Sequence, residues 1–161
     1  LHRLDRRQRQ MCIRDSIKMV CRLIDERYPD YDNVIPSDNS NTVTITKSEL
    51  LGSLKRISIY ANKTTNQVRF KITGSEILIS AEDLDFSNEA NERISCEHDG
   101  DDIEIGFNAK FLIEMLSNIE SEKVILKLSE PNRAGLLIPE DINDNEDITM
   151  LVMPVMLNDN A

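Results

Sequence analysis

The chain has 161 residues, of which 40% are hydrophobic, and a formal net charge of −10 at pH 7. That length predicts about one domain, and the composition is typical of a folded globular protein rather than a disordered chain. No run of about 18 apolar residues occurs, which excludes a membrane-spanning helix. The acidic balance argues against general nucleic-acid binding but does not exclude a local basic face.

Cysteine usage bears on the compartment. The three cysteines, at positions 12, 21 and 96, are an odd number and lack the spacing of a metal site. Reduced thiols in a cytoplasmic protein are the simplest interpretation. No signal peptide is recognisable, which agrees with a cytoplasmic location.

The first 15 residues differ from the rest of the chain. They hold five arginines and two aspartates, whereas the remainder has 14 basic and 27 acidic residues. The segment has no clear apolar period, and Met-Cys-Ile-Arg-Asp-Ser at residues 11–16 resembles translated adapter sequence. We therefore expect residues 1–15 to be a non-native leader and exclude them from fold reasoning. The alternative is a basic arm that binds nucleic acid.

A proline-bracketed stretch, Tyr-Pro-Asp-Tyr-Asp-Asn-Val-Ile-Pro at residues 28–36, separates two parts of the chain. Each proline restricts its own backbone and that of the preceding residue, so neither a long helix nor a central strand can pass through. The stretch is too apolar for a free linker, and we interpret it as a packed connector. Residues 16–36 are then the end of one domain plus this connector, residues 37–157 are a complete domain, and residues 158–161 are a tail.

Alternating apolar residues predict most of the strands. A first strand at residues 17–24 would end the preceding domain. Residues 82–90 are expected to be an acidic loop, and residues 98–101 a hairpin turn. Within the main domain the predicted strands are residues 42–46, 67–73, 76–81, 92–97, 102–107, 123–129, 135–138 and 148–157.

Two helices interrupt these strands. Thr46 and Glu49 have the spacing of a capping box at the start of the first helix, and Asn108 can cap the second. Both helices carry apolar residues at helical spacing. Those of the first are Leu50, Leu51, Leu54, Ile57 and Tyr60, and those of the second are Phe111, Leu112, Met115, Leu116 and Ile119.

The order strand, helix, strands occurs twice, at an offset of about 60 residues. Thr-Ile-Thr-Lys-Ser-Glu-Leu-Leu at residues 44–51 passes from strand into helix, as does Glu-Ile-Gly-Phe-Asn-Ala-Lys-Phe-Leu at residues 104–112. The repeat predicts an α+β fold of two β-α-β-β-β halves, with sheets on one side and two helices on the other.

Residues for catalysis or metal binding are scarce. Of the two histidines, His2 lies in the leader and His98 in an acidic turn, and no phosphate-binding glycine loop or nucleophile motif is present. Residues 141–152 begin like a calcium loop, but Glu146 and Val152 stand where glycine and glutamate are needed. The sequence therefore predicts no catalytic residue, no metal site and no cofactor.

The end of the chain, residues 150–157, reads Met-Leu-Val-Met-Pro-Val-Met-Leu. Pro154 ends regular strand pairing, and methionine suits adaptable contact surfaces. Pattern alone leaves two alternatives open, a plain core strand or the rim of a peptide groove.

Three stretches together resemble a known family. Residues 28–36, Ile-Glu-Ile-Gly-Phe-Asn-Ala-Lys-Phe-Leu at residues 103–112, and Val-Met-Pro-Val-Met-Leu at residues 152–157 are similar in order and spacing to the C-terminal third of the bacterial beta sliding clamps, the beta subunits of DNA polymerase III. The resemblance implies a non-catalytic processivity factor whose full-length homodimer forms a ring of six similar domains around duplex DNA. Its implied partners are the DNA polymerase III alpha subunit, the clamp loader, other polymerases and repair proteins, which bind through short linear motifs.

The resemblance also implies functional residues. Lys47, Lys55, Arg56 and Lys110 would face the DNA, and Ile59 and Tyr60 would meet the partner chain. Many relatives carry arginine at Asn33 and Met-Arg at residues 155–156, which puts the motif preference of this chain in question. The implied peptide pocket comprises Pro29, Val34, Asn108, Phe111, Leu151, Met153, Pro154, Val155, Met156 and Leu157.

The alternative interpretation, which does not use the resemblance, is a stand-alone acidic α+β interaction module. An enzyme would require His98 or the acidic turns to carry a strongly perturbed pKa.

Overall fold

The structure is a computed structural model that describes residues 9–14, 17–22, 26, 30–142 and 146–157. It divides into two compact units, Leu1–Val34 and Ile35–Ala161. In the part of the chain that the structure describes, no helix is long and apolar enough to cross a membrane.

The first unit contains a small antiparallel sheet. Strand β1 (Arg9–Arg14) pairs with β2 (Ile17–Arg22), so that Met11 lies opposite Val20. The strand predicted at residues 17–24 is confirmed as far as Arg22. Strand β1 was not predicted, because residues 1–15 were expected to be a non-native leader and were excluded from fold reasoning. The connector includes one 3-10 turn, η1 (Tyr31–Asn33), closed by the Val34 N–H donating to the Tyr31 carbonyl at 2.9 Å.

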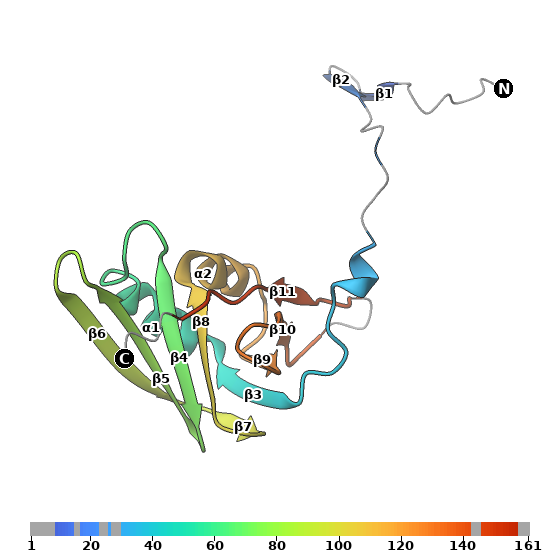
Figure 1. Ribbon diagram of the computed structural model, residues 1–161. Helices are drawn as coiled ribbons and strands as arrows, with labels where there is room; N and C mark the ends of the chain where they lie inside the picture. The colour runs from blue at the N-terminus through green and yellow to red at the C-terminus, as the bar shows by residue number, and fades with distance from the viewer. Residues whose placement is uncertain (1–8, 15–16, 23–25, 27–29, 143–145, 158–161) are drawn as a thin grey trace. The chain divides into compact units, whose positions relative to one another are not determined.

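The second unit consists of two antiparallel sheets and two helices (Figure 1). One sheet has the strand order β11-β10-β9-β3-β7, and the other has the order β6-β5-β4-β8. The two helices contact one another; α1 also contacts β3, β5 and β6, and α2 contacts β8 and β11. The elements are β3 (Asn41–Thr46), α1 (Lys47–Ile57), β4 (Gln67–Thr73), β5 (Glu76–Asp83), β6 (Asn88–Ser95), β7 (Glu97–Asp99), β8 (Ile103–Asn108), α2 (Ala109–Ser117), β9 (Lys123–Leu128), β10 (Gly135–Pro139) and β11 (Met150–Val152).

The predicted repeat is confirmed, with one feature that the sequence did not predict. The halves are β3-α1-β4-β5-β6 and β8-α2-β9-β10-β11, and the first strand of each half pairs in the sheet of the other half. Val43 of β3 lies opposite Leu126 of β9, and Phe70 of β4 lies opposite Ile105 of β8. This exchange interlocks the halves, so each sheet needs residues from both.

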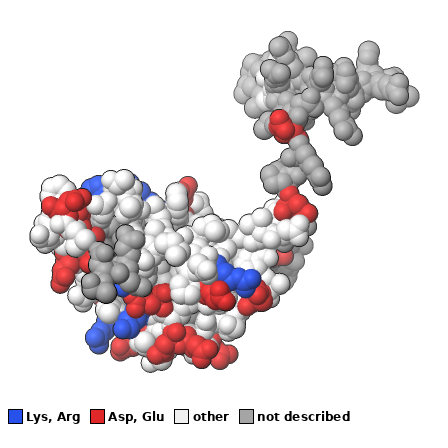
Figure 2. Space-filling model, viewed as in Figure 1, with Lys and Arg blue, Asp and Glu red and all other residues white. Residues whose placement is uncertain are grey.

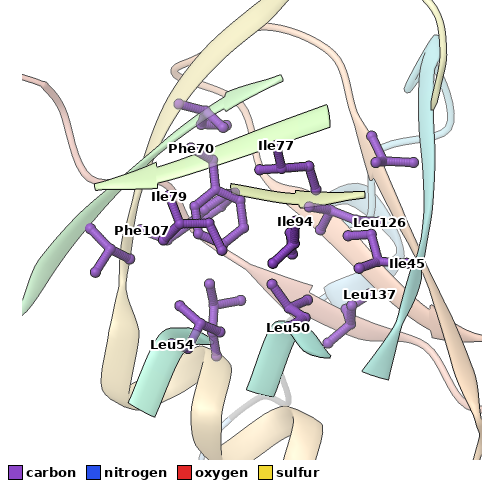
Figure 3. Close-up of a cluster of buried hydrophobic side chains, with 14 of the residues drawn as sticks. Ile45, Leu50, Leu54, Phe70, Ile77, Ile79, Ile94, Phe107, Leu126 and Leu137 are labelled. Atoms are coloured by element: carbon purple, nitrogen blue, oxygen red, sulfur yellow. The ribbon is translucent and has the colours of Figure 1, made fainter. Parts of the chain in front are cut away.

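The hydrophobic core lies between the two sheets and the helices (Figure 3). Leu50 and Leu54 of α1 point towards Phe70 of the four-stranded sheet. The Phe70 and Phe107 rings meet edge to face, with centroids 5.4 Å apart. Complete burial of each such side chain contributes about 1.5–3 kcal/mol, so this core supports both sheets that carry the surface features described below.

Two predicted connections are wrong. The acidic loop is only residues 84–87, because β5 and β6 continue pairing as far as Asp83 and Asn88. The strands predicted at residues 92–97 and 102–107 form no hairpin, since β6 and β8 lie at opposite edges of their sheet. Between them Glu97–Asp99 forms β7, which pairs with β3 in the other sheet.

The two helix starts differ. Asn108 caps α2 as predicted, because its side chain accepts a hydrogen bond from the Lys110 N–H at 3.0 Å. Thr46 precedes α1 but makes no such bond, so the predicted capping box is absent. A tertiary contact replaces it: the Lys47 N–H donates to the Glu122 carbonyl at 2.9 Å.

Candidate peptide-binding site and basic surface

The C-terminal segment passes from one sheet to the other. Val152, the last residue of β11, lies opposite Gly135 of β10 in the five-stranded sheet. Three residues later, the Val155 N–H donates to the Gly106 carbonyl of β8 at 2.8 Å, in the four-stranded sheet. We call residues 153–157 the strap; in Figure 1 it is the red trace that leaves β11 and crosses β8. The strand predicted at residues 148–157 is thus limited to Met150–Val152, and it ends before Pro154, which cannot donate to a ladder.

The strap exposes apolar side chains at the surface. Met153 and Met156 are 59% and 69% exposed, and Phe111 in the first turn of α2 is 60% exposed. Leu151, Pro154, Val155 and Leu157 are half-buried, whereas Val152 is buried. Apolar side chains gathered at a surface mark interaction sites more often than isolated ones do. Phe111 was counted among the apolar residues at helical spacing in the second helix, but its side chain faces solvent.

Asn108 positions Phe111 through both ends of its amide. Its Oδ1 caps α2, and its Nδ2 donates to the Thr65 carbonyl at 3.0 Å. The first turn of α2 is therefore attached to the loop before β4. Asn108 is half-buried, and both its amide oxygen and its amide nitrogen are hydrogen-bonded within the protein.

Two residues of the predicted pocket belong to the first unit, whereas the strap belongs to the second. Pro29 lies outside the described residues, and Val34 belongs to the first unit. Their membership of the pocket stays a prediction.

The four predicted DNA-facing residues fall into two groups. Lys47 Nζ donates to the Ile119 carbonyl at 2.8 Å, and the Arg56 guanidinium pairs with Glu92 of β6. The hydrogen bond from Arg56 is the main cause that lowers the pKa of the Glu92 carboxyl. Lys55 and Lys110 are exposed, and the described residues offer neither of them an ion pair. Figure 2 shows several clusters of acidic side chains and fewer basic ones on the visible face.

The predicted partner-facing residues lie at the end of α1. Ile59 and Tyr60 are 65% and 43% exposed. Two further apolar side chains, Leu84 and Phe86, were not predicted from the sequence as surface residues; they are 71% and 72% exposed in the short loop between β5 and β6. Their position inside a stretch of acidic residues could have predicted that these two apolar side chains are exposed.

A hydrogen-bonded link brings these two loops together. The Asn62 side chain donates to Asp83 and to Asp85, at 3.4 Å in both cases. A polar cavity of about 450 Å³ lies beside this link. Its lining residues are Asn62, Thr65, Gln67, Arg69, Ser80, Ala81, Glu82, Leu84, Asp85, Glu89, Ala90 and Asn91.

Reactive groups do not converge in the described structure. Among residues 9–14, 17–22, 26, 30–142 and 146–157, no three His, Cys, Asp or Glu side chains are grouped to hold a metal ion. Cys96 is buried, and burial raises the pKa of its thiol, which disfavours the reactive thiolate. His98 lies on β7 rather than in the predicted turn.

Comparison with known proteins agrees with this geometry. Residues 32–156 match the family described as DNA polymerase III beta subunit, C-terminal domain. The curated beta sliding clamp of Pseudomonas putida is 31% identical over 136 residues, which are 84% of this chain and 36% of that protein. This chain thus spans about a third of the length of that relative.

Solved structures show the same fold. The DNA polymerase III beta subunit of Thermotoga maritima is 28% identical, with a TM-score of 0.83 over 93% of this chain and 40% of that chain. A DnaN sliding clamp of Pseudomonas aeruginosa, bound to griselimycin, is 29% identical, with a TM-score of 0.80 over 87% of this chain and 37% of that one. Sequence match and fold agree over most of the described residues, and the chain belongs to the family of the DNA polymerase III beta subunit, C-terminal domain.

Proposed function

We propose that this chain is the C-terminal part of a non-catalytic DNA sliding clamp that recruits replication and repair proteins in the cytoplasm. In the full-length homodimer, a ring encircles duplex DNA and tethers the replicative polymerase. The single observation that carries the recruiting role is the exposure of three large apolar side chains, Phe111 at the start of α2 and Met153 and Met156 on the strap. Family membership supports the rest of the proposal.

The recruiting surface suits a short apolar motif. Met153 and Met156 are flexible and polarisable, and Phe111 adds an aromatic face held in place by Asn108. Such surfaces depend on a few anchor side chains rather than on total area. Ligands of this site are motifs from the polymerase alpha subunit, the clamp loader, other polymerases and repair proteins.

The DNA-facing role rests on fewer residues than the sequence implied. Lys55 and Lys110 remain available for phosphate oxygens, whereas Lys47 already donates to a backbone carbonyl and Arg56 pairs with Glu92. Contacts of this kind are independent of sequence and weaken as salt rises. Two exposed lysines on an acidic domain hold DNA weakly, so encirclement by a complete ring has to supply the retention.

Peptide titration tests the recruiting role. A fluorescent peptide carrying a Gln-Leu-x-Leu-Phe motif is titrated with the 161-residue chain, and anisotropy is recorded. We expect saturable binding that Met153→Ala with Met156→Ala weakens by at least about tenfold, because apolar anchors dominate such sites. Both side chains are more than half exposed, so their removal leaves the core intact.

A matched control separates the site from general stickiness. Leu84→Ala with Phe86→Ala truncates side chains of similar exposure in the loop between β5 and β6. That variant should bind the peptide as wild type does. Equal losses in both double variants would contradict a specific site on the strap.

A further inference from the structure

A glycine lies beneath the strap where it meets β8. A Cβ atom added at Gly106 would lie 2.5 Å from the Val155 carbonyl oxygen and 2.8 Å from Leu157 Cδ2. Real Cβ atoms do not approach a backbone oxygen so closely, so any larger residue would push the strap outwards. A glycine inside a strand often marks such a close backbone approach.

Backbone conformation does not explain this glycine. In the described part of the chain, the glycines with positive φ are Gly74 and Gly100, which leaves Gly106 in a conformation that other residues adopt. The requirement at Gly106 is therefore for space. Gly135 lies opposite Val152, where the crossing begins, and a larger residue is easier to accommodate there. Its Cβ would meet mainly the Leu128 and Val152 side chains, at 2.9 and 3.4 Å.

The internal repeat supplies a comparison within the same molecule. Counted from the helix N-caps Thr46 and Asn108, the position that corresponds to Gly106 is Thr44. Thr44 lies opposite Glu97 of β7. Strand β7 follows the first half and pairs with β3, the first strand of that half; the strap likewise follows the second half and contacts β8, the first strand of that half. There the crossing segment makes three regular pairs, whereas the strap makes the single bridge of Val155 with Gly106. The two crossings share a topology, and the second lies over a glycine.

We propose that Gly106 is a positioning residue that sets the height of the strap above β8 and thereby the depth of the peptide site. This inference rests on the proposed function for its ligand, an apolar linear motif. The half-buried Leu157 lies over Gly106 and forms the inner side of the strap, while Met153 and Met156 face outwards. Raising the strap would displace those outer side chains relative to Phe111.

The test is Gly106→Ala in the 161-residue chain, with two readouts. Methyl NMR of ¹³C-labelled methionine reports the positions of Met153 and Met156, and anisotropy of the Gln-Leu-x-Leu-Phe peptide reports binding. We expect both methyl resonances to shift and the peptide Kd to rise at least about tenfold. Gly52→Ala is the matched control: its Cβ would meet only the flexible end of Arg56, at 3.2 Å, so it should change neither readout.

Each other result is decisive. Folded Gly106→Ala with unmoved methyl resonances, or with a peptide Kd within about twofold of wild type, would overturn the proposal. If Gly106→Ala does not fold, Val155→Pro decides, because it removes the donor to the Gly106 carbonyl and leaves β8 unchanged. Normal peptide binding by Val155→Pro would overturn the proposal. If wild type binds no peptide, the proposed function fails, while the methyl resonances still show whether Gly106 positions the strap.

Discussion

Replacing Asn108 should reveal how the start of α2 is held. Asn108→Ala removes the cap, at a cost of about 1 kcal/mol. It also removes the hydrogen bond to the Thr65 carbonyl, which contributes a net amount of about 1 kcal/mol. We therefore expect the free energy of unfolding to fall by about 2 kcal/mol. Asn108→Ser keeps a capping oxygen and loses the reach to Thr65, so its loss should be about half as large.

Urea unfolding followed by circular dichroism measures these differences, since the chain has no tryptophan for fluorescence. Thr46→Val is the control at the equivalent position of the other helix, where no side-chain cap is made. It should change the free energy of unfolding by less than about 0.5 kcal/mol. The reasoning would be refuted if Asn108→Ser cost as much as Asn108→Ala, or if Thr46→Val cost as much as either.

Three further predictions use the same unfolding measurement. Lys47→Met should lower the free energy of unfolding by about 1–3 kcal/mol, because the ammonium bonded to the Ile119 carbonyl is lost; no change would show that this contact is not formed in solution. Leu54→Ala should cost about 2–5 kcal/mol, because this side chain is completely buried, and a smaller cost would contradict the packing. Wild type should exceed Glu92→Gln in stability at neutral pH. Since the pKa of Glu92 is lowered, that excess should disappear as the pH falls from the ordinary value of 4.5 through the lowered one; an excess that persists in acid would exclude the Arg56 pair as its source.

Local patterns predicted the regular elements well. Residues 67–73 form β4 because Val68, Phe70 and Ile72 alternate strictly and all three are buried. The cap at Asn108 was also predictable, since it depends on one side chain and the adjacent backbone. Features determined within a few residues of sequence were therefore accessible without a structure.

Features that depend on distant partners were not accessible. The capping box at Thr46 failed because the Glu122 carbonyl, which is remote in sequence, satisfies the first N–H of α1. The hairpin predicted around His98 does not form, because β6 pairs with β5 and β8 pairs with β4, which places β6 and β8 at opposite edges of one sheet. In the candidate site, the strap residues were predicted from resemblance. The bond from Lys47 to the Ile119 carbonyl and the ion pair of Arg56 with Glu92 were not predictable, because both partners are remote in sequence.

The exchange of first strands explains why the candidate site lies where it does. Strand β8 pairs in the sheet of the first half, whereas β11 pairs in the sheet of its own half. A segment that follows β11 and reaches β8 must therefore cross between sheets, and residues at the crossing leave the ladder with their side chains partly uncovered. The first half makes the same crossing with β7, but three regular pairs keep that segment flat against β3. The strap makes a single bridge over Gly106, and its Met153 and Met156 side chains are exposed. One topology thus yields a charged edge strand, Glu97–Asp99, in one half and an apolar segment with Met153 and Met156 in the other, and the side chains of the crossing segment decide which.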